Sequence, residues 1–349
     1  MSSPTLALAM DLPIHYIAQA PVNSQGPMPT TVHSDSVYGA PLSLTARRDP
    51  ELTPALSLGR QLLRATRLLH PELTVDSLKH RARLLCRMML HYRLLRSYYF
   101  DDTNPALQEM MRHRPTVVGA VGRPYLHAEW KTKKRLEIVS QHYRHLHAGV
   151  RFLRFTPGTS VCVARLQEHP EIELRLDHAA WFMSEGEIVL NLFESSTRLF
   201  SLAFTVGNDS AARVAYVGAV QGYAGDDALA IYRRLTRTLH GMRPRDFLVA
   251  MFRQLCNELG IDAIYGAPEE ARLHRSSFYK NHLGVETNYD EMWRGFGGTR
   301  LNNGFWSISP ILSYRTLEKT PVRKRALYRR RYEMLDELGA QLRFMVRSK

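Results

Sequence analysis

The sequence predicts an α+β fold in which helices come first, an antiparallel sheet follows, and a long helix ends the chain. Apolar residues recur at helical spacing before about residue 150. Apolar and polar residues then alternate in five short runs between residues 160 and 221. The segments between these runs are short, which is typical of hairpins and therefore of antiparallel strands. Because the strands are grouped together rather than alternating with helices throughout, the predicted class is α+β.

Composition limits the kinds of partner to be expected. The chain has 349 residues, of which 44% are hydrophobic, so it can bury a substantial core. Its 47 Lys and Arg against 33 Asp and Glu give a formal net charge of +14, which favours acidic partners such as nucleic acid, anionic lipid or a phosphorylated cofactor. Arginine-rich helix faces in water would give the same charge. Nucleic-acid binding is the weakest of these interpretations, because no zinc-ligand spacing, RNP-type motif or helix-turn-helix pattern accompanies the charge.

The cysteines and the N-terminus indicate an intracellular protein. Cys86, Cys162 and Cys256 lie in apolar stretches without CxxC spacing, which predicts buried free thiols in a reducing compartment. No Lys or Arg precedes Arg47, so the positive start of a secretory signal is missing. No apolar run reaches transmembrane length. We therefore expect a protein that begins near Met1 and stays in the cytoplasm, with peripheral attachment to the inner membrane left open.

The chain divides into four predicted parts. Residues 1–54 form a tail predicted to be disordered, because the first fifty residues hold seven of the 18 prolines and show no apolar period. Residues 55–150 form a helical region packed on the core. Residues 151–315 form the main α+β domain, and residues 316–349 form a basic C-terminal helix.

The helical region contains a basic amphipathic stretch. From Ser77 to Phe100 there is no acid but six Lys and Arg residues, so this stretch can lie on an anionic membrane or bind phosphates. An ordinary surface helix with its arginines in water is the favoured explanation, because any surface helix has a charged outer face. The apolar stripe that would face the core consists of Leu84, Leu85, Met88, Tyr92, Leu95 and Tyr99.

Two further segments complete this region. Val117–Tyr125 is predicted to be a loop-like, packed connection. Trp130–Val150 is predicted to be an amphipathic helix, with His142 buried and hydrogen-bonded and with His145 and His147 exposed. Two His residues one turn apart without further Cys or carboxylate ligands are a weak metal signal, so no metal site is predicted.

The sheet and its continuation are predicted from changes of period. The five strands are expected at Ser160–Leu166, Glu171–Asp177, Ile188–Glu194, Arg198–Val206 and Arg213–Gln221. After the last of them the chain turns at Gly222 and Gly225 into a helix whose first turn carries Asp226 and Asp227. The remaining elements are a helix Pro244–Leu259, a short strand Ile261–Tyr265, a helix and strand within residues 276–286, a strand Phe305–Ile308, and a helix Pro321–Lys349 with nine basic residues against three acids.

The second half of the chain resembles the GCN5-related N-acetyltransferase (GNAT) domain. The segment Ser276–Glu286 resembles the late part of that domain, where a helix with a Phe-Tyr pair leads through a Gly step into a strand. The turn Gln221–Asp226 approximates its pyrophosphate loop, although a Gly falls at the fourth position after Gln221. The early helices, the meander and the later strand and helix also follow the order of elements in GNAT domains. The resemblance implies acetyl-CoA or another acyl-CoA as donor.

The resemblance also implies roles for particular residues. Backbone groups from Val217 to Val220 would polarise the thioester carbonyl. Tyr279 would be the general acid, and Glu194 at a strand end is our candidate base. Asp226 and Asp227 at the helix N-terminus oppose an anion there. The residues expected to surround the donor are Val217, Val220, Gln221, Gly222, Tyr223, Ala224 and Gly225.

Several separated blocks resemble the VirK/YbjX family of proteobacterial proteins. The similarity covers roughly residues 56–342, and the Pro-containing N-terminal tail departs from the basic start of shorter members. The resemblance implies links to virulence, envelope integrity and resistance to cationic peptides, without a settled reaction. The matching blocks are His142–Gly149, Leu199–Gly207, Ala215–Gly222, Phe278–Gly284, Tyr289–Gly298 and Lys324–Leu338.

The sequence leaves two hypotheses. In the first, the protein is an acyl-CoA-dependent or acyl-carrier-dependent acyltransferase that modifies an envelope-precursor acceptor. In the second, it is a non-enzymatic accessory protein that binds anionic lipid or a protein partner through the basic stretches Ser77–Phe100 and Pro321–Lys349. The oligomeric state and the identities of donor and acceptor stay open.

Overall fold

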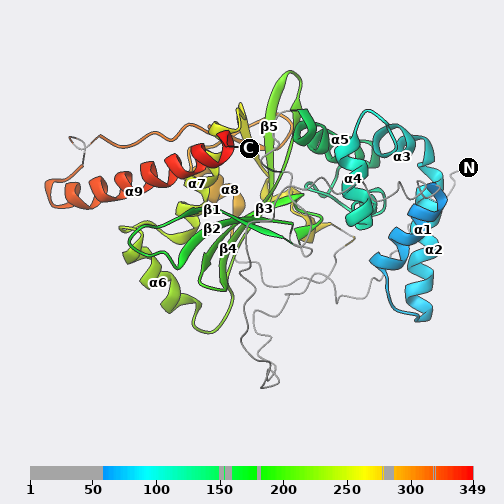
Figure 1. The fold of residues 1–349 in the computed structure, drawn as a ribbon, viewed down its shortest axis with the longest axis horizontal. Helices are drawn as coiled ribbons and strands as arrows, with labels where there is room; N and C mark the ends of the chain where they lie inside the picture. The colour runs from blue at the N-terminus through cyan, green and yellow to red at the C-terminus, as the bar shows by residue number, and fades with distance from the viewer. Residues whose placement is uncertain are drawn as a thin grey trace, which may run out of the picture.

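A computed structural model describes residues 58–148, 153, 159–178, 182–276, 278, 287–316, 318 and 320–348. The predicted N-terminal tail and most of the predicted helix and strand within residues 276–286 lie outside the described residues. In the described part the α+β prediction is confirmed. N-terminal helices lie at one end of the molecule, a sheet lies at its centre, and a long C-terminal helix lies at the other end (Figure 1).

The N-terminal helices begin and end where local sequence signals place them. Thr74 caps a helix by accepting a hydrogen bond from the Ser77 N–H at 3.2 Å. Asn104 caps another helix that has Pro105 in its first turn. The predicted stretch from Ser77 to Phe100 is broken into two helices at His91. The helices are α1 (Leu58–Leu69), α2 (Val75–Leu90), α3 (Tyr92–Tyr99), α4 (Pro105–His113) and α5 (Thr132–Ala148).

The predicted connection Val117–Tyr125 is packed, as expected, but it is not irregular. Most of it belongs to the 3-10 helix η2 (Pro115–Val121), whose residues are almost all buried. Small residues such as Gly119 and Ala120 let the helix pack tightly, and Pro115 at its first turn needs no intrahelical N–H partner. The sequence pattern missed this element because so short a helix leaves too few turns to show a period.

Within the described residues the strands form an eight-stranded sheet in the order β1-β2-β3-β4-β5-β6-β8-β7. The predicted five-strand antiparallel meander is confirmed by the pairing of β1 through β5. β5 and β6 are parallel, and the remaining neighbours are antiparallel. The strands are β1 (Ser160–Arg165), β2 (Ile172–Asp177), β3 (Ile188–Glu194), β4 (Thr197–Asp209), β5 (Ala212–Gly222), β6 (Ala263–Gly266), β7 (Thr299–Arg300) and β8 (Trp306–Ile308).

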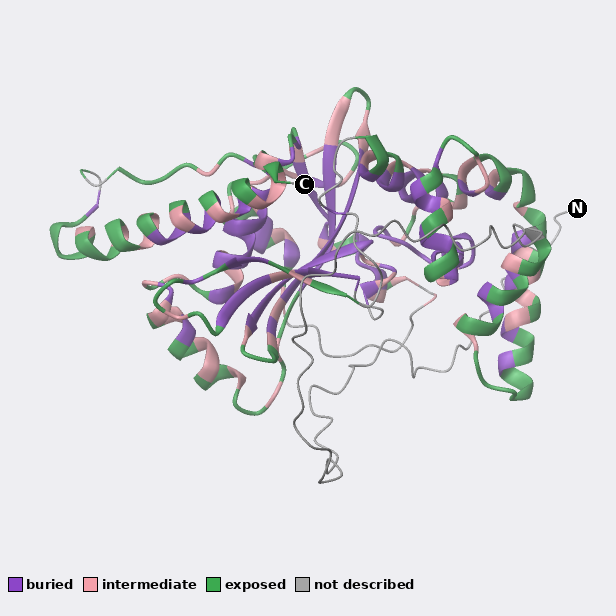
Figure 2. Cartoon of the chain, in the orientation of Figure 1, coloured by how far each residue is buried: buried purple, intermediate pink, exposed green. Residues whose placement is uncertain are grey.

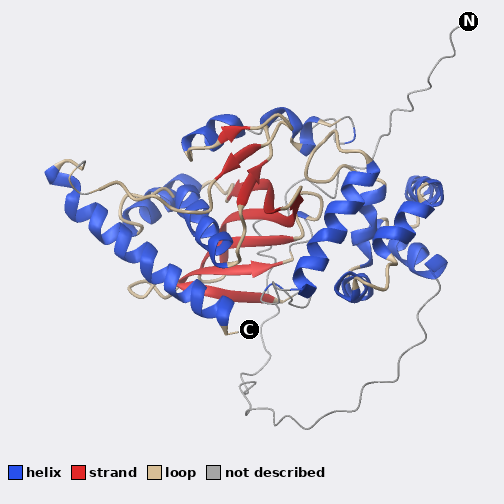
Figure 3. Cartoon of the chain, turned by 90° about the horizontal axis from the view of Figure 1, so that it is seen from above, coloured by secondary structure: helices blue, strands red, loops and turns tan. Residues whose placement is uncertain are grey.

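Helices cover the sheet and bury its centre. The crossover between the parallel strands β5 and β6 contains α6 (Ala228–Thr238) and α7 (Pro244–Glu258), and α7 packs on β3, β4 and β5. α9 (Val322–Arg347) packs on α7 and β1, while α5 packs on β4 from the N-terminal side (Figure 3). The strands are largely buried, and the outer faces of α6 and α9 are exposed (Figure 2). The sequence pattern did not predict α8 (Tyr289–Gly295).

Predictions about four single residues are wrong. Tyr92, placed on the core-facing stripe, is exposed. Cys86 and Cys162 are exposed, because Cys86 lies on the outer face of α2 and Cys162 lies on the edge strand β1. Cys256 is a buried free thiol, as predicted. His145 is half-buried rather than exposed, because its ring hydrogen-bonds the Asn208 side chain at 2.8 Å.

His142 is buried and hydrogen-bonded, as predicted: its Nδ1 accepts the Val206 N–H at 3.1 Å. Burial lowers the pKa of His142 to about 3. Its ring is therefore neutral at physiological pH and joins α5 to β4 as a fixed acceptor.

The search for a membrane-crossing helix covers the described residues, and among them none combines the necessary length and apolarity.

Candidate functional site

β5 extends beyond its pairing with β6 at the residues where the sequence predicts the acyl donor to bind. The two strands pair from Val214 to Val217, and the Ala267 N–H makes a last bond to the Val217 carbonyl at 3.0 Å. β6 has ended at Gly266, whereas β5 continues to Gly222. The end of β5, from Gly218 to Gly222, therefore has no strand partner on the β6 side and is open to contacts from other elements of the fold.

Two aromatic residues of α8 lie at this edge. The Tyr289 hydroxyl accepts the Val220 N–H at 2.7 Å and donates to the Val220 carbonyl at 3.0 Å. The Trp293 indole N–H donates to the Ala267 carbonyl at 2.8 Å, and its ring covers Gly266 so closely that a Cβ there would lie 2.3 Å from it. α8 thus satisfies backbone groups that β6 leaves without a strand partner.

Arg272 covers the tyrosine. Its guanidinium carbon lies 3.8 Å from the centre of the Tyr289 ring, and Nη1 donates to the Thr287 carbonyl at 3.1 Å and to Glu269 at 3.3 Å. Burial raises the pKa of Tyr289 to about 12, against the opposing effect of the Arg272 charge. The hydroxyl is therefore protonated at neutral pH and is a neutral hydrogen-bond donor.

Glu185 approaches β5 from the turn before β3. The backbone carbonyl of Glu185 lies directly over Gly218, where a Cβ would be 2.2 Å from it. The Glu185 carboxyl is within 3.5 Å of the Gln221 amide nitrogen. Burial raises the pKa of Glu185 to about 7, although Arg272 opposes the shift. Part of the residue stays accessible to solvent. A carboxyl that titrates near neutrality and is reachable from solvent has the chemistry of a general base.

The glycine at position 218 makes this approach possible. Gly218→Ala is expected to lower the free energy of unfolding by about 1 to 3 kcal/mol, because the new methyl group would overlap a backbone atom that cannot rotate away. The measurement is urea denaturation. Gly295→Ala is the matched control, since a Cβ at Gly295 meets nothing within 4 Å. Equal stability of the two variants would show that the turn moves freely away from β5.

Glu187 fixes the turn that carries Glu185. Its carboxylate, 1% exposed, forms an ion pair with Arg114 and accepts hydrogen bonds from the hydroxyls of Tyr125 at 2.9 Å and Tyr143 at 2.6 Å. Its N–H donates to the Thr205 hydroxyl at 3.1 Å. These partners come from the N-terminal helical region and from β4, so the network joins both to the start of β3. The sequence analysis missed it, because residues so far apart in the chain share no local pattern.

The predicted pyrophosphate loop has an acidic character. Gln221, Gly222 and Ala224 are exposed. Tyr223 folds back over Gly225, where a Cβ would lie 2.2 Å from the tyrosine hydroxyl. A hydrogen bond with Asp227 raises the pKa of Tyr223. The start of α6 thus has a carboxylate and a tyrosine where a phosphate would need donors.

Of the two predicted catalytic residues, the structure describes only Glu194. Glu194 ends β3 and forms a two-contact ion pair with Arg234 of α6, with one contact at 2.5 Å. β4 separates it from β5, and its charge is used to hold α6 on the sheet. Tyr279 lies outside the described residues. The structure brings Glu185 and Gln221 together instead, and only Gln221 was among the predicted site residues.

A polar row crosses the sheet and ends at Glu185. In register, Arg175 on β2 faces Asn191 on β3, which faces Ser201 on β4, which faces Gln221 on β5. The Ser201 hydroxyl donates to the Asn191 side chain at 2.7 Å. Polar residues at facing positions of neighbouring strands were the signal for this row, but the pairing register was needed to see it.

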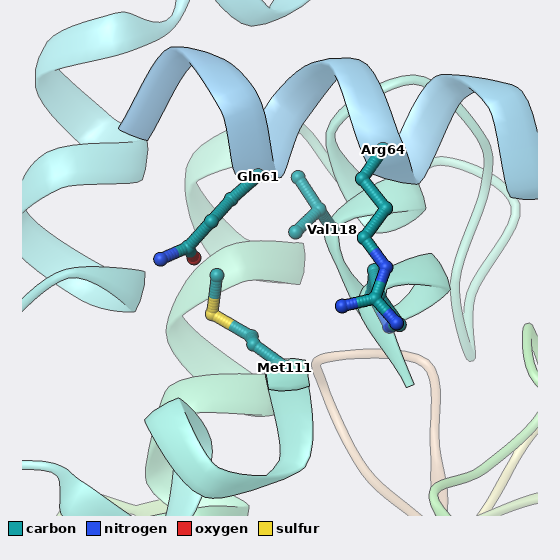
Figure 4. A pocket seen from close by; sticks show the side chains of 5 residues that line it. Gln61, Arg64, Met111 and Val118 are labelled. Carbon is teal, nitrogen blue, oxygen red and sulfur yellow. The ribbon is translucent and has the colours of Figure 1, made fainter. Parts of the chain in front are cut away.

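Other parts of the described chain offer less chemistry. A pocket between α1, α4 and η2 is lined by Gln61, Arg64, Met111, Pro115 and Val118 (Figure 4). It contains no acid or nucleophile that could do covalent chemistry. The described residues also contain no group of three or more His, Cys, Asp or Glu that could hold a metal ion.

Comparison with known proteins places the chain in a family. The model for "Protein of unknown function (DUF535)" matches residues 74–343. The chain belongs to the DUF535 family. "Uncharacterized protein YbjX" of Escherichia coli (strain K12) is 25% identical over 70% of this chain and 76% of its own length. Together these matches confirm the predicted VirK/YbjX resemblance.

Two further relatives add little on activity. An "Uncharacterized protein" of Haemophilus influenzae is 29% identical over 52% of this chain and 60% of its own length. "Membrane protein LapB" of Mannheimia haemolytica is 24% identical over 54% of this chain and 83% of its own length. No solved structure gives a significant match.

Proposed function

We propose that the protein is an acyltransferase that takes an acyl group from a thioester donor. The donor would bind along the end of β5 that extends beyond its pairing with β6. The observation that carries the proposal is the position of Glu185. Its backbone carbonyl lies over Gly218 of β5, and its carboxyl, with a pKa of about 7, lies 3.5 Å from the Gln221 side-chain nitrogen at the end of that strand. The parallel pair β5 and β6, joined through helices after an antiparallel meander, agrees with the order expected from the GNAT resemblance.

The proposed reaction needs one base, one acid and hydrogen-bond donors to the carbonyl. Glu185 takes the proton of the acceptor hydroxyl or amine, which then attacks the thioester carbonyl carbon. The carbon–sulfur bond breaks, and the leaving thiolate takes a proton from an acid, for which Tyr279 stays the candidate. Val220 N–H is engaged by Tyr289 in the free protein. A bound donor would take over this N–H, and the released Tyr289 hydroxyl would donate to the same carbonyl oxygen.

The proposed cellular role is support of the bacterial envelope, with an envelope precursor as acceptor and with the protein on the cytoplasmic side of the inner membrane. Membership in the VirK/YbjX family supports this role, and the name of the Mannheimia relative, a membrane protein, is in line with it. Resistance to cationic peptides and virulence would follow from an altered envelope.

Thermal unfolding with candidate donors tests the proposal. We expect acetyl-CoA or a long-chain acyl-CoA to raise the stability of the protein by about 2.7 kcal/mol when its concentration is a hundred times its Kd. Free CoA is the control for binding of the nucleotide part alone. Tyr289→Phe should bind the donor more weakly, because the hydroxyl that would donate to the donor's carbonyl oxygen is lost. An unchanged melting temperature with every CoA ester up to millimolar concentration would refute donor binding.

A further inference from the structure

α2 has a second apolar face, which points away from the protein. Its first face is buried through Leu84 and Met88. The second face carries residues at successive positions i, i+3, i+7, i+11 and i+14, the spacing of a straight stripe along a helix. We name it the outer stripe; it consists of Val75, Leu78, Ala82, Cys86 and Met89, of which Val75 is 68%, Leu78 50% and Met89 67% exposed.

Neighbouring residues extend the apolar surface. Leu90 is 79% exposed, and Leu73 lies exposed just before the N-terminus of α2. Single exposed apolar residues are normal on a soluble protein, but a continuous row of them marks a surface that meets another apolar phase.

Most of the charges around the outer stripe are basic, although the exposed Glu72 stands just before α2. Lys79, Arg93 and Arg96 are exposed on α2 and α3, and from Ser77 to Phe100 the sequence has no acid. Asp76 at the start of α2 is paired with Lys79 at 3.3 Å. On α1, which packs beside α2, Arg60 and Arg67 are exposed.

This combination selects one occupant. A second copy of the chain would bring two sets of arginines together, and like charges across an interface oppose binding. An anionic membrane surface offers hydrocarbon to the apolar row and phosphate groups to the basic residues at once. We propose that the protein binds anionic lipid bilayers through the outer stripe of α2, with the helix lying in the plane of the membrane surface.

The structure separates this surface from the other basic helix. α9 lies at the opposite end of the molecule from α1 and α2 (Figure 1). Its apolar residues Met334, Leu338 and Leu342 are buried against the rest of the fold. From Met334 to Leu342, α9 therefore has no exposed apolar stripe beside its charges, and we do not include it in the proposed surface.

Vesicle cosedimentation tests the proposal. The full-length protein is expected to bind vesicles that mix phosphatidylcholine with phosphatidylglycerol. It should bind vesicles of pure phosphatidylcholine much more weakly. Raising the salt concentration from about 0.1 M to about 1 M shortens the Debye length from roughly 10 Å to roughly 3 Å and should release bound protein. Equal binding to both kinds of vesicle would overturn the charge argument.

Matched variants locate the contact. Replacing Lys79, Arg93 and Arg96 by Gln should lower the partition coefficient by about a hundred-fold, since each basic residue near the surface contributes roughly five-fold. Leu78→Asp with Met89→Asp should also remove binding. Leu229→Asp with Ile311→Asp is the control, because these residues are equally exposed but lie elsewhere. A control pair that weakened binding as much as the stripe pair would overturn the assignment to α2.

A label on Cys86 gives a second readout that does not depend on sedimentation. In a Cys162→Ser background the exposed Cys86 is the accessible thiol, since Cys256 is buried. An environment-sensitive fluorophore there should shift to the blue with anionic vesicles and stay unchanged with neutral ones. A change in the oligomeric state of the stripe variants, measured by size-exclusion chromatography with vesicle binding retained, would instead assign the stripe to a second copy and overturn the proposal. Membrane binding and acyl transfer are separable, because transfer to a soluble acceptor needs no vesicle.

Discussion

Replacing Arg114 with Met is expected to lower the free energy of unfolding by about 3 to 5 kcal/mol at neutral pH. The reason is the Glu187 carboxylate, which has a 1% exposed side chain and depends on the 11% exposed Arg114 for its counter-charge. Without the guanidinium, Tyr125 and Tyr143 still donate hydrogen bonds, but no positive charge offsets burial of the carboxylate. Urea denaturation monitored by circular dichroism measures the loss.

The pH dependence of this loss identifies its cause. In the wild type, burial acts to raise the pKa of Glu187, but Arg114 and the hydroxyls of Tyr143 and Tyr125 hold it below its usual range. A lowered pKa gives stability that is present above the unfolded value of about 4.3 and is lost as pH falls through the folded value. In Arg114→Met burial dominates and raises the pKa. The deficit should therefore grow as pH rises above about 4.3 and be smallest below it.

Two further variants make the test selective. Glu187→Gln in the Arg114→Met background should recover part of the lost stability, because a neutral amide needs no counter-charge but can still accept from the tyrosines. Glu194→Ala breaks the Arg234 pair, in which the arginine is 48% exposed, and should cost no more than about 1 kcal/mol. A similar small loss for Arg114→Met would contradict the role given to the buried pair.

Glu185→Gln is expected to lower the rate of acyl transfer by about 10²-fold to 10⁴-fold, the usual contribution of a positioned general base. The amide keeps the size of the carboxyl and its contact with Gln221 but cannot take a proton. In the wild type the rate should rise with pH and level off above about 7, the pKa of Glu185, because the base must be ionised. The variant should lose this midpoint. The rate of acyl transfer is measured from the release of free thiol.

The same substitution has a stability signature that requires no substrate. The folded pKa of Glu185 is raised to about 7, above the unfolded value of about 4.3. Its contribution to stability is therefore greatest below about 4.3 and is lost as pH rises through about 7. The melting temperature of Glu185→Gln should lack this fall. If the variant kept both the wild-type rate and the wild-type pH profile, Glu185 would not be the base.

Local patterns were sufficient for most of the elements. The alternation of apolar and polar residues from Ser160 to Gln221 predicted the meander, and the helix predicted at Pro244–Leu259 agrees with α7 to within one residue. These signals succeed because capping and periodicity depend on residues a few positions apart. The α8 helix was missed, since seven residues between turn signals give too few periods to detect.

The candidate site was only partly predictable. Gln221 and Val220 were placed correctly at the end of a strand before a helix, but Glu194 was proposed as base and proves to be paired with Arg234. Glu185 drew no attention in the sequence, because it lies in a turn between Ser184 and Gly186, where an acid is usually an exposed polar residue. Its raised pKa arises from burial in the folded chain, where its backbone packs against Gly218, a residue distant in the chain.

The sequence by itself determined the class of fold, the order of its elements and the family, because these follow from local periods and from separated blocks of matching residues. Tertiary structure alone decided which polar residues meet. It set the register that aligns Arg175, Asn191, Ser201 and Gln221, and it ended β6 early enough for Tyr289 to bond β5. It also left the outer stripe of α2 without a partner among the described elements. These outcomes depend on the packing of segments far apart in the chain. Packing decides which carboxyl is buried, which raises its pKa, and which apolar residues stay in contact with water, which costs free energy.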